Sequence, residues 1–190
     1  TLSNYNGFQV SCNGGSNGSI GINVTGGNGP INIILNPLGP NTITLPNPAN
    51  FTGLPAGNYT VVIRDLVSNC PDITRNIVLT APPALQANVT QLAAILCNGN
   101  FATYQAVVTG GVPFTSGSQY QYLWTPSNEI TSSATNLPAG TYNVLVTDAN
   151  GCSSVSAPIS VNVSNAPVPT ISATSTQACS GDVVTVTSSA

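Results

Sequence analysis

Charged side chains are scarce in this 190-residue sequence, where Asp, Glu, Lys and Arg together make up only 4% of the residues. An average soluble protein has roughly 25%. Lysine, histidine and methionine do not occur, and Arg64 and Arg75 are the only basic side chains. Affinity for phosphate needs several clustered cations, so this composition excludes a nucleic-acid partner.

The missing histidine and lysine also leave few means of catalysis. A serine or threonine nucleophile needs a neighbouring base to take its proton, and neither of these residues is present. Cysteine metal sites are usually recognised by a Cys-x-x-Cys pair or a nearby histidine, and the sequence has neither. We therefore expect no enzyme activity, no catalytic or metal-binding residues and no cofactor.

Long apolar runs are missing as well. No stretch approaches the roughly 18 residues that a spanning helix needs, because Gly, Pro, Asn or Thr interrupts each one. Disorder is nevertheless excluded, since 41% of the residues are hydrophobic and fall in short alternating runs. We expect a folded segment without membrane insertion, whose uncharged polar surface is nearly indifferent to salt and suits an extracellular setting.

An eleven-residue signature beginning with Leu-Pro-Ala-Gly occurs twice, at residues 54–64 and 137–147. The two copies start 83 residues apart, and Cys12, Cys97 and Cys179 follow one another at nearly the same step. Each repeat is therefore the size of a small domain. We predict one immunoglobulin-like repeat over 1–83, a second over 84–167 and the beginning of a third over 168–190.

Helix signals are absent, and short apolar runs alternate with turn residues, which predicts an antiparallel sandwich. The expected strands are 18–25, 31–35, 41–45, 58–65 and 73–80 in the first repeat, and 101–109, 119–124, 129–135, 141–148 and 154–163 in the second. Prolines at 82–83 and within 166–169 favour stiff joints. The predicted fold class is all-β, with tandem immunoglobulin-like antiparallel β-sandwich domains in a rod-like array.

The signature has a structural interpretation. Its glycines, Gly57 and Gly140, would form a turn, and its tyrosines, Tyr59 and Tyr142, would form the tyrosine corner of an immunoglobulin-like sandwich. An aspartate closes each copy, at Asp65 and Asp148. Such a side chain either caps the following turn by accepting backbone N–H groups or contributes to a calcium site at the module joint.

Tyr120, Tyr122 and Trp124 alternate along one expected strand of the second repeat, where the first repeat has Ile31, Ile33 and Leu35. Aromatic side chains at period two are consistent with a core-facing stripe. An exposed row of the same side chains would instead form a sugar-stacking platform, which makes these three residues candidate ligand contacts.

The cysteines are expected to form one disulfide within each repeat, Cys12 with Cys70 and Cys97 with Cys152. Each bond would close a loop of nearly 60 residues, and in the chain-entropy model such a loop is worth on the order of 4 kcal/mol. In each repeat the bond would pin the end of the sandwich. Disulfides also indicate export to an oxidising compartment.

The order of these motifs resembles the SprB-type repeats of very large surface adhesins in gliding bacteria. The shared order is a cysteine, a Gly-Gly turn with a following proline, an alternating strand, the signature, and Asn-Gly-Cys. The second repeat has all of these motifs, whereas the first has an aliphatic strand and Ser68-Asn69-Cys70 in place of Asn150-Gly151-Cys152. The resemblance implies secretion to the cell surface, anchoring of a long fibre, and adhesion.

We therefore expect a structural and adhesive repeat region of an extracellular surface adhesin or filament, providing reach and surface contact. Its expected partners are further copies of the repeat, in the same or neighbouring chains, and surface polysaccharide. Two alternatives are a carbohydrate-binding module array and a filament subunit that donates the strands of 168–190 to a neighbour.

Overall fold

The protein is described by a computed structural model that covers residues 1–36, 43–67, 70–93, 101–162, 170–173 and 186–189. In these residues every regular element is a β-strand, and the strands pair antiparallel. The predicted all-β, immunoglobulin-like class is therefore confirmed. Within the same residues no helix has the length and apolar character needed to cross a membrane.

Two sheets enclose the first hydrophobic core, and we call them the first sandwich. One sheet pairs β1 (Gly18–Ile22) with β4 (Ala49–Leu54), and the other has the order β3 (Ile43–Pro46), β2 (Ile31–Asn36), β5 (Gly57–Asp65) and β6 (Ile73–Leu79). Alternate residues of these strands point inward, as a half-buried sheet requires. The buried core is formed by Ile20, Ile33, Leu35, Ala49, Phe51, Leu54, Tyr59, Val61 and Leu79.

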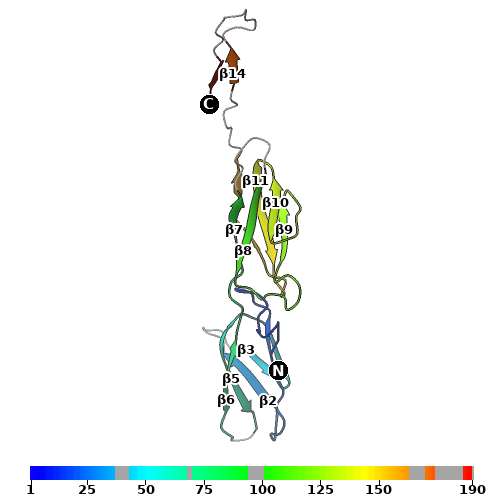
Figure 1. The fold of residues 1–190 in the computed structure, drawn as a ribbon. Helices are drawn as coiled ribbons and strands as arrows, with labels where there is room; N and C mark the ends of the chain where they lie inside the picture. The colour runs from blue at the N-terminus through cyan, green and yellow to red at the C-terminus, as the bar shows by residue number, and fades with distance from the viewer. Residues whose placement is uncertain (37–42, 68–69, 94–100, 163–169, 174–185, 190) are drawn as a thin grey trace, which may run out of the picture.

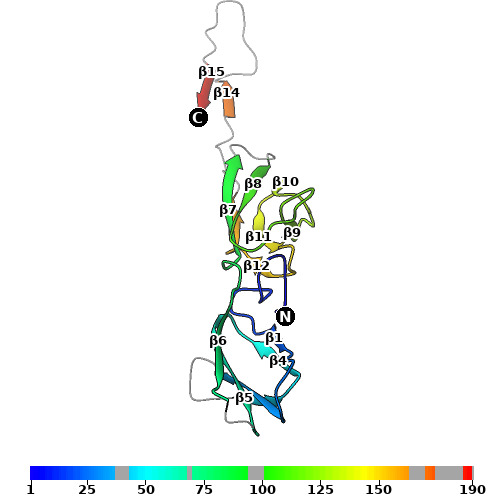
Figure 2. The same ribbon diagram turned by 90° about the horizontal axis from the view of Figure 1, so that it is seen from below.

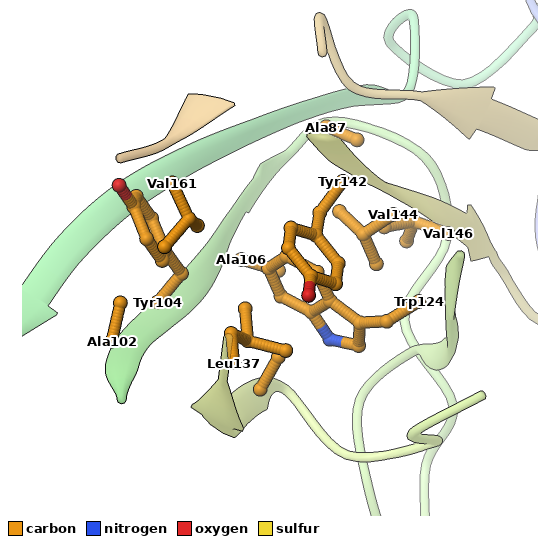
Figure 3. Close-up of a cluster of buried hydrophobic side chains, with 11 residues drawn as sticks. Ala87, Ala102, Tyr104, Ala106, Trp124, Leu137, Tyr142, Val144, Val146 and Val161 are labelled. Atoms are coloured by element: carbon orange, nitrogen blue, oxygen red, sulfur yellow. The ribbon is translucent and has the colours of Figure 1, made fainter. Parts of the chain in front are cut away.

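A second pair of sheets, the second sandwich, encloses its own core. One sheet has the order β10 (Ser133–Leu137), β8 (Ala102–Thr109) and β7 (Gln86–Ala93). In the other, β11 (Gly140–Thr147) pairs with β9 (Gln121–Thr125), β12 (Ser153–Val155) and β13 (Ile159–Val161). Figure 3 shows Trp124 and Tyr142 lying together among the smaller side chains of this core.

The two sandwiches repeat the same strand register. Leu35 on β2 faces Val61 on β5, and Trp124 on β9 faces Val144 on β11. All four side chains are buried. The aliphatic stripe of β2 and the aromatic stripe of β9 therefore occupy equivalent positions in the two cores, as the sequence predicted.

Apart from shifts at strand ends, of which the largest moves the predicted strand over 129–135 to β10, the predicted strands differ from the observed ones in three places. β4 and β7 were not expected, and the predicted strand over 154–163 is divided into β12 and β13 by Ser156, Ala157 and Pro158. Proline removes a backbone donor, which interrupts pairing at this point. The expected proline joint at 166–169 lies outside the described residues.

A separate two-stranded sheet pairs β14 (Thr170–Ala173) with β15 (Val186–Ser189). These strands, which one alternative would donate to a neighbour, pair with each other in an antiparallel register. In Figures 1 and 2 the first and second sandwiches lie one beyond the other, with the blue N-terminal segment between them.

Candidate functional site at the joint between the sandwiches

A disulfide connects the two sandwiches. It joins Cys12 to Cys152, with 5.7 Å between their Cα atoms and 140 residues between them in the sequence. Cys70 is an exposed free thiol. The predicted pairs, Cys12 with Cys70 and Cys97 with Cys152, are therefore wrong for Cys12, Cys70 and Cys152; Cys97 itself lies outside the described residues.

The position of strand β6 explains why Cys12 and Cys70 do not pair. The backbone N–H groups of Gln9 and Val10 donate to the carbonyl of Thr80, which places Cys12 beside the end of β6. Cys70 precedes the start of the same strand. The seven residues of β6 span about 20 Å at the usual rise, whereas the Cα atoms of a disulfide must lie within about 7 Å.

Hydrogen bonds of Asn150 reinforce the disulfide at the joint. Its side-chain Nδ2 donates to the backbone carbonyls of Ser11, at 2.9 Å, and Tyr5, at 3.4 Å. Its Oδ1 accepts a bond of 2.7 Å from Nδ2 of Asn6. Both the N–H₂ group and the oxygen of this one amide therefore find their hydrogen-bond partners on the N-terminal segment of the first sandwich.

A glycine pair allows the connecting chain to lie against the second sandwich. Gly110 and Gly111 both have positive φ angles, of 72° and 64°. A Cβ atom at Gly110 would collide with the carbonyl of Ala84, and one at Gly111 would lie 2.8 Å from the Leu85 side chain. The N–H of Gly111 donates to the carbonyl of Pro83 at 2.9 Å. Only glycine fits this backbone conformation and close approach together.

Asp148 shapes the turn that carries Cys152. One carboxylate oxygen accepts the N–H of Val112, and the other accepts those of Asn150 and Cys152, all at 2.9 Å. The carboxylate is buried, with 1% of the residue exposed. This is the capping role considered for Asp148, because both oxygens are directed at backbone donors of the turn.

The equivalent Asp65 has the same role in the first sandwich. Its two oxygens accept the N–H groups of Asn28, at 3.1 Å, and Val67, at 2.9 Å. No cluster of three or more His, Cys, Asp or Glu side chains suited to a metal ion occurs in the described part of the chain.

Both signature tyrosines donate a hydrogen bond back to the turn before their strand. The Tyr59 hydroxyl donates to the carbonyl of Pro55 at 2.8 Å, and that of Tyr142 to Pro138 at 3.1 Å. This is the tyrosine-corner geometry. Gly57 and Gly140 begin strands β5 and β11 at these corners. Burial raises the pKa of the Tyr59 phenol.

Of the three aromatic side chains on and just before β9, Trp124 is not available to a sugar ring. Trp124 is fully buried, and its indole N–H donates to the carbonyl of Thr131 at 3.0 Å. Tyr120 packs at the edge of the core and donates to the carbonyl of Gly110 at 2.9 Å. Burial, together with the neighbouring Tyr120, raises the pKa of Tyr122. The ligand contact considered at Trp124 is therefore wrong, because this side chain has no surface to offer a sugar ring. Tyr120 and Tyr122 are partly exposed and line a surface pocket with Ile130, so ligand contact at these two residues stays a prediction.

Several residues of the joint had no role in the sequence-based prediction. Asn6, Ser11 and Asn150 were not singled out as contacts between repeats, because nothing in the sequence states which ends of the sandwiches meet. One signal was present: the second repeat has Asn150-Gly151-Cys152 where the first has Ser68-Asn69-Cys70. That difference marks the residue whose amide makes the contacts of the joint.

The fold and the joint define a class of protein: consecutive immunoglobulin-like β-sandwiches that are joined covalently. A model of the SprB repeat matches residues 9–39, which confirms the resemblance inferred from the motifs. The matched stretch contains Cys12 and the Gly-Gly turn, and it lies in the first repeat although the second has the fuller set of motifs. No curated protein matches the sequence.

Two solved structures are similar to this chain at low sequence identity. One holds the N-terminal eight Ig domains of Down Syndrome Cell Adhesion Molecule; it is 14% identical, with a TM-score of 0.37, over 83% of this chain and 25% of that chain. The other, described as the structural basis for Dscam isoform specificity, is 13% identical, with a TM-score of 0.35, over 83% of this chain and 42% of that one. This chain therefore spans less than half the length of either.

Proposed function

We propose that this chain is a non-enzymatic, structural and adhesive repeat region of an extracellular surface adhesin or filament, in which rod-like arrays of sandwiches provide reach and surface contact. The observation that carries the proposal is the Cys12–Cys152 bond between consecutive sandwiches. A covalent joint of this kind serves a protein that transmits force between distant points.

The position of the disulfide in the chain determines how it would act under tension. A pull applied to the two ends of the chain passes from Cys12 through the sulfur atoms to Cys152. The 140 residues between these cysteines include the whole first core and all of the second core except Val161 on β13. Apart from β13, the strands of both cores therefore do not have to resist the pull, and they are protected from extension while the bond is intact.

Other features support the same proposal. The SprB-repeat match lies in the segment that carries Cys12. A disulfide favours an oxidising, extracellular compartment. The surface has very few charges, so contacts made there are insensitive to ionic strength. Burial of Trp124 removes the main support for a carbohydrate-binding array.

Antibody labelling of intact cells tests the proposal. Fab fragments raised against the folded chain should label unpermeabilised cells, the label should lie on extended surface material in electron micrographs, and the fragments should reduce attachment of the cells to a surface. Fab fragments against an unrelated surface protein serve as the control for attachment. Labelling only after permeabilisation would contradict the proposal.

A further inference from the structure

The free Cys70 is the counterpart of Cys152 in the first repeat, at five rather than four residues after the aspartate that closes the signature. Cys152 follows Asp148 at the turn after β11, and Cys70 follows Asp65 at the turn after β5. We infer that the end of the first sandwich around Cys70 is a docking site for another copy of the repeat, joined in tandem, whose Cys12 forms a disulfide with Cys70. The inference rests on the proposed function only for its biological setting.

The aspartates that precede the two cysteines accept two equivalent hydrogen bonds each. Asp65 accepts the N–H groups of Asn28 and Val67, and Asp148 accepts those of Val112 and Asn150. The bonded partners are equivalent in the repeat. Asp65 therefore holds Asn28 and Val67 at this end of the first sandwich as Asp148 holds Val112 and Asn150 at the equivalent end of the second.

The glycine pair that receives the connecting chain is also present. Gly26 and Gly27 have φ angles of 96° and 98° and correspond to Gly110 and Gly111. A Cβ atom at Gly110 would meet Ala84 of the connecting chain, whereas one at Gly26 would meet nothing within 4 Å. The surface that contacts residues 83–85 in the second sandwich is thus open in the first.

An apolar pocket adjoins Cys70 at this end. It has a volume of about 210 Å³ and is lined by Gly26, Gly27, Ile31, Ile63, Cys70 and Ile73, among others. Large apolar side chains are exposed at the same end, with Leu66 at 53%, Val67 at 67% and Ile73 at 48%. In the joint that the structure contains, the equivalent end of the second sandwich is in contact with residues 5–13 of the first.

The occupant is therefore another copy of the repeat. Two of its segments would contact this end of the first sandwich: residues 5–13, which carry Cys12, and the connecting residues 81–85. The backbone of residues 5–13 is already arranged for this contact, because Ser11 is held by two hydrogen bonds with the Asn17 side chain.

The new joint differs in one respect. Alignment on the cysteines pairs Asn150 with Ser68, but the N–H of Val67 donates to Asp65 as that of Asn150 donates to Asp148. By this bond Val67 is the counterpart of Asn150, and valine cannot make the amide bonds to Ser11 and Asn6.

Formation of the bond needs an oxidant, for which glutathione disulfide is sufficient. The Cys70 thiol and the Cys12 thiol of the other copy lose two protons and two electrons as their sulfur atoms join. One molecule of glutathione disulfide takes up the two protons and the two electrons and becomes two molecules of glutathione thiol. The exchange proceeds through a mixed disulfide that the second thiolate attacks.

A chain with a duplicated first repeat tests the inference directly. Residues 1–85 are placed before the complete 190-residue chain, so that Thr1 takes the place of Gln86 and keeps the 85-residue step from Cys12 to Cys97. The protein is refolded in a glutathione redox buffer, free thiols are alkylated, and disulfide-linked peptides are identified by mass spectrometry.

Two peptide pairs are expected, the added Cys12 with Cys70 and the original Cys12 with Cys152. Because neighbouring repeats have effective concentrations on the order of millimolar, alkylation of Cys70 should fall by about tenfold relative to the original chain. Val67→Asn should make the new bond form at a lower proportion of oxidised glutathione. Cys70→Ser should leave the added Cys12 open to alkylation.

A Cys70 that stays fully alkylated while Cys12–Cys152 forms in the same molecule would overturn the inference, as would a bond between Cys70 and Cys12 of its own repeat.

A second measurement uses the unaltered chain and a peptide of residues 4–17 activated at Cys12 as a thiopyridyl disulfide. Faster reaction of Cys70 with this peptide than with a scrambled one is expected, and equal rates would contradict it. Failure of either measurement would leave the proposed function untouched, because that function is tested separately by antibody labelling of intact cells.

Discussion

At the scale of single residues, Trp124 and Leu35 show how one core position tolerates very different side chains. Both face the signature strand of their sandwich and both are fully buried. The indole brings a polar N–H into the core, and its bond to the carbonyl of Thr131 removes the cost of burying that group. The indole can therefore be buried at this position because the neighbouring loop supplies an acceptor for its N–H group.

Trp124→Ala should destabilise the second sandwich by about 3–5 kcal/mol, because it removes a fully buried aromatic ring and leaves a cavity. Urea unfolding followed by circular dichroism measures the change, since tyrosines are the remaining fluorophores. The matched control is Leu123→Ala on the opposite face of β9, where the side chain is 41% exposed and the loss should be below about 1 kcal/mol. Equal losses from both substitutions would show that the strand is oriented differently.

Arg64 and Asp72 form an exposed ion pair, with 2.7 Å between Nη2 and Oδ2. Hydrogen bonding to the Arg64 guanidinium holds the pKa of Asp72 below its ordinary value. A lowered folded-state pKa stabilises the fold above the ordinary carboxyl pKa, and this contribution is lost as the pH falls through the folded-state pKa.

Arg64→Gln should therefore raise the Asp72 pKa toward its ordinary value, as measured by carbon-13 NMR of the carboxyl group. High salt should have the same effect, because the pair is exposed and screened. Arg75→Gln is the control, since the Arg75 guanidinium donates to the backbone carbonyl of Thr74. An unchanged Asp72 titration in Arg64→Gln would mean that the ion pair does not persist in solution.

At the scale of elements, the turn after β11 depends on one carboxylate. Asp148→Asn keeps the size of the side chain but replaces one acceptor oxygen with an N–H₂ group that faces backbone donors. Leaving buried donors unpaired should cost about 2–3 kcal/mol, measured by urea unfolding. The matched substitution Asp65→Asn should cost less, because Asp65 is only partly buried. A larger loss for Asp65→Asn would contradict this account of burial.

The strands were predictable where they alternate strongly and follow a recognisable turn. β5 and β11 were predicted within one residue at each end, because Tyr59 and Tyr142 open a clear period-two pattern. β4 was missed because it contains Gly53, which has a positive φ angle and interrupts the apolar alternation. β7 was missed because its outward-facing residues are polar and only Ala87 is buried.

The role of each cysteine could not be predicted, because it depends on which ends of the sandwiches meet. Sequence spacing placed Cys12 and Cys70 in one repeat, and proximity in sequence favoured their pairing. The length of β6 separates them, whereas the contact between sandwiches brings Cys12 to Cys152. Only the three-dimensional arrangement contains that information.

At the scale of the whole molecule, the disulfide makes two small sandwiches into one mechanical unit. Each core alone is small, and domains of this size have marginal stability. In the chain-entropy model a loop as long as the one closed by Cys12–Cys152 is worth about 5 kcal/mol. The bond also decides which part of the chain is stretched when the protein is pulled from its ends.

Single-molecule pulling from the two termini should therefore give different results for the oxidised and reduced protein. With the bond intact, the residues between Cys12 and Cys152 cannot extend, so the unfolding of both cores should remain unseen. Reduction or Cys152→Ser should release about 480 Å of additional contour length, at 3.3–3.6 Å for each of the 140 residues. The gain should appear as two unfolding events, one for each hydrophobic core.

Cys70→Ser is the matched control for this measurement, because it removes an exposed thiol that takes no part in the bond. Its force–extension trace should equal that of the unaltered oxidised protein. If the oxidised protein already extends by the full length, tension does not pass through Cys12 and Cys152. The proposed role in transmitting force would then lose its physical basis, because each core would have to resist the load by itself.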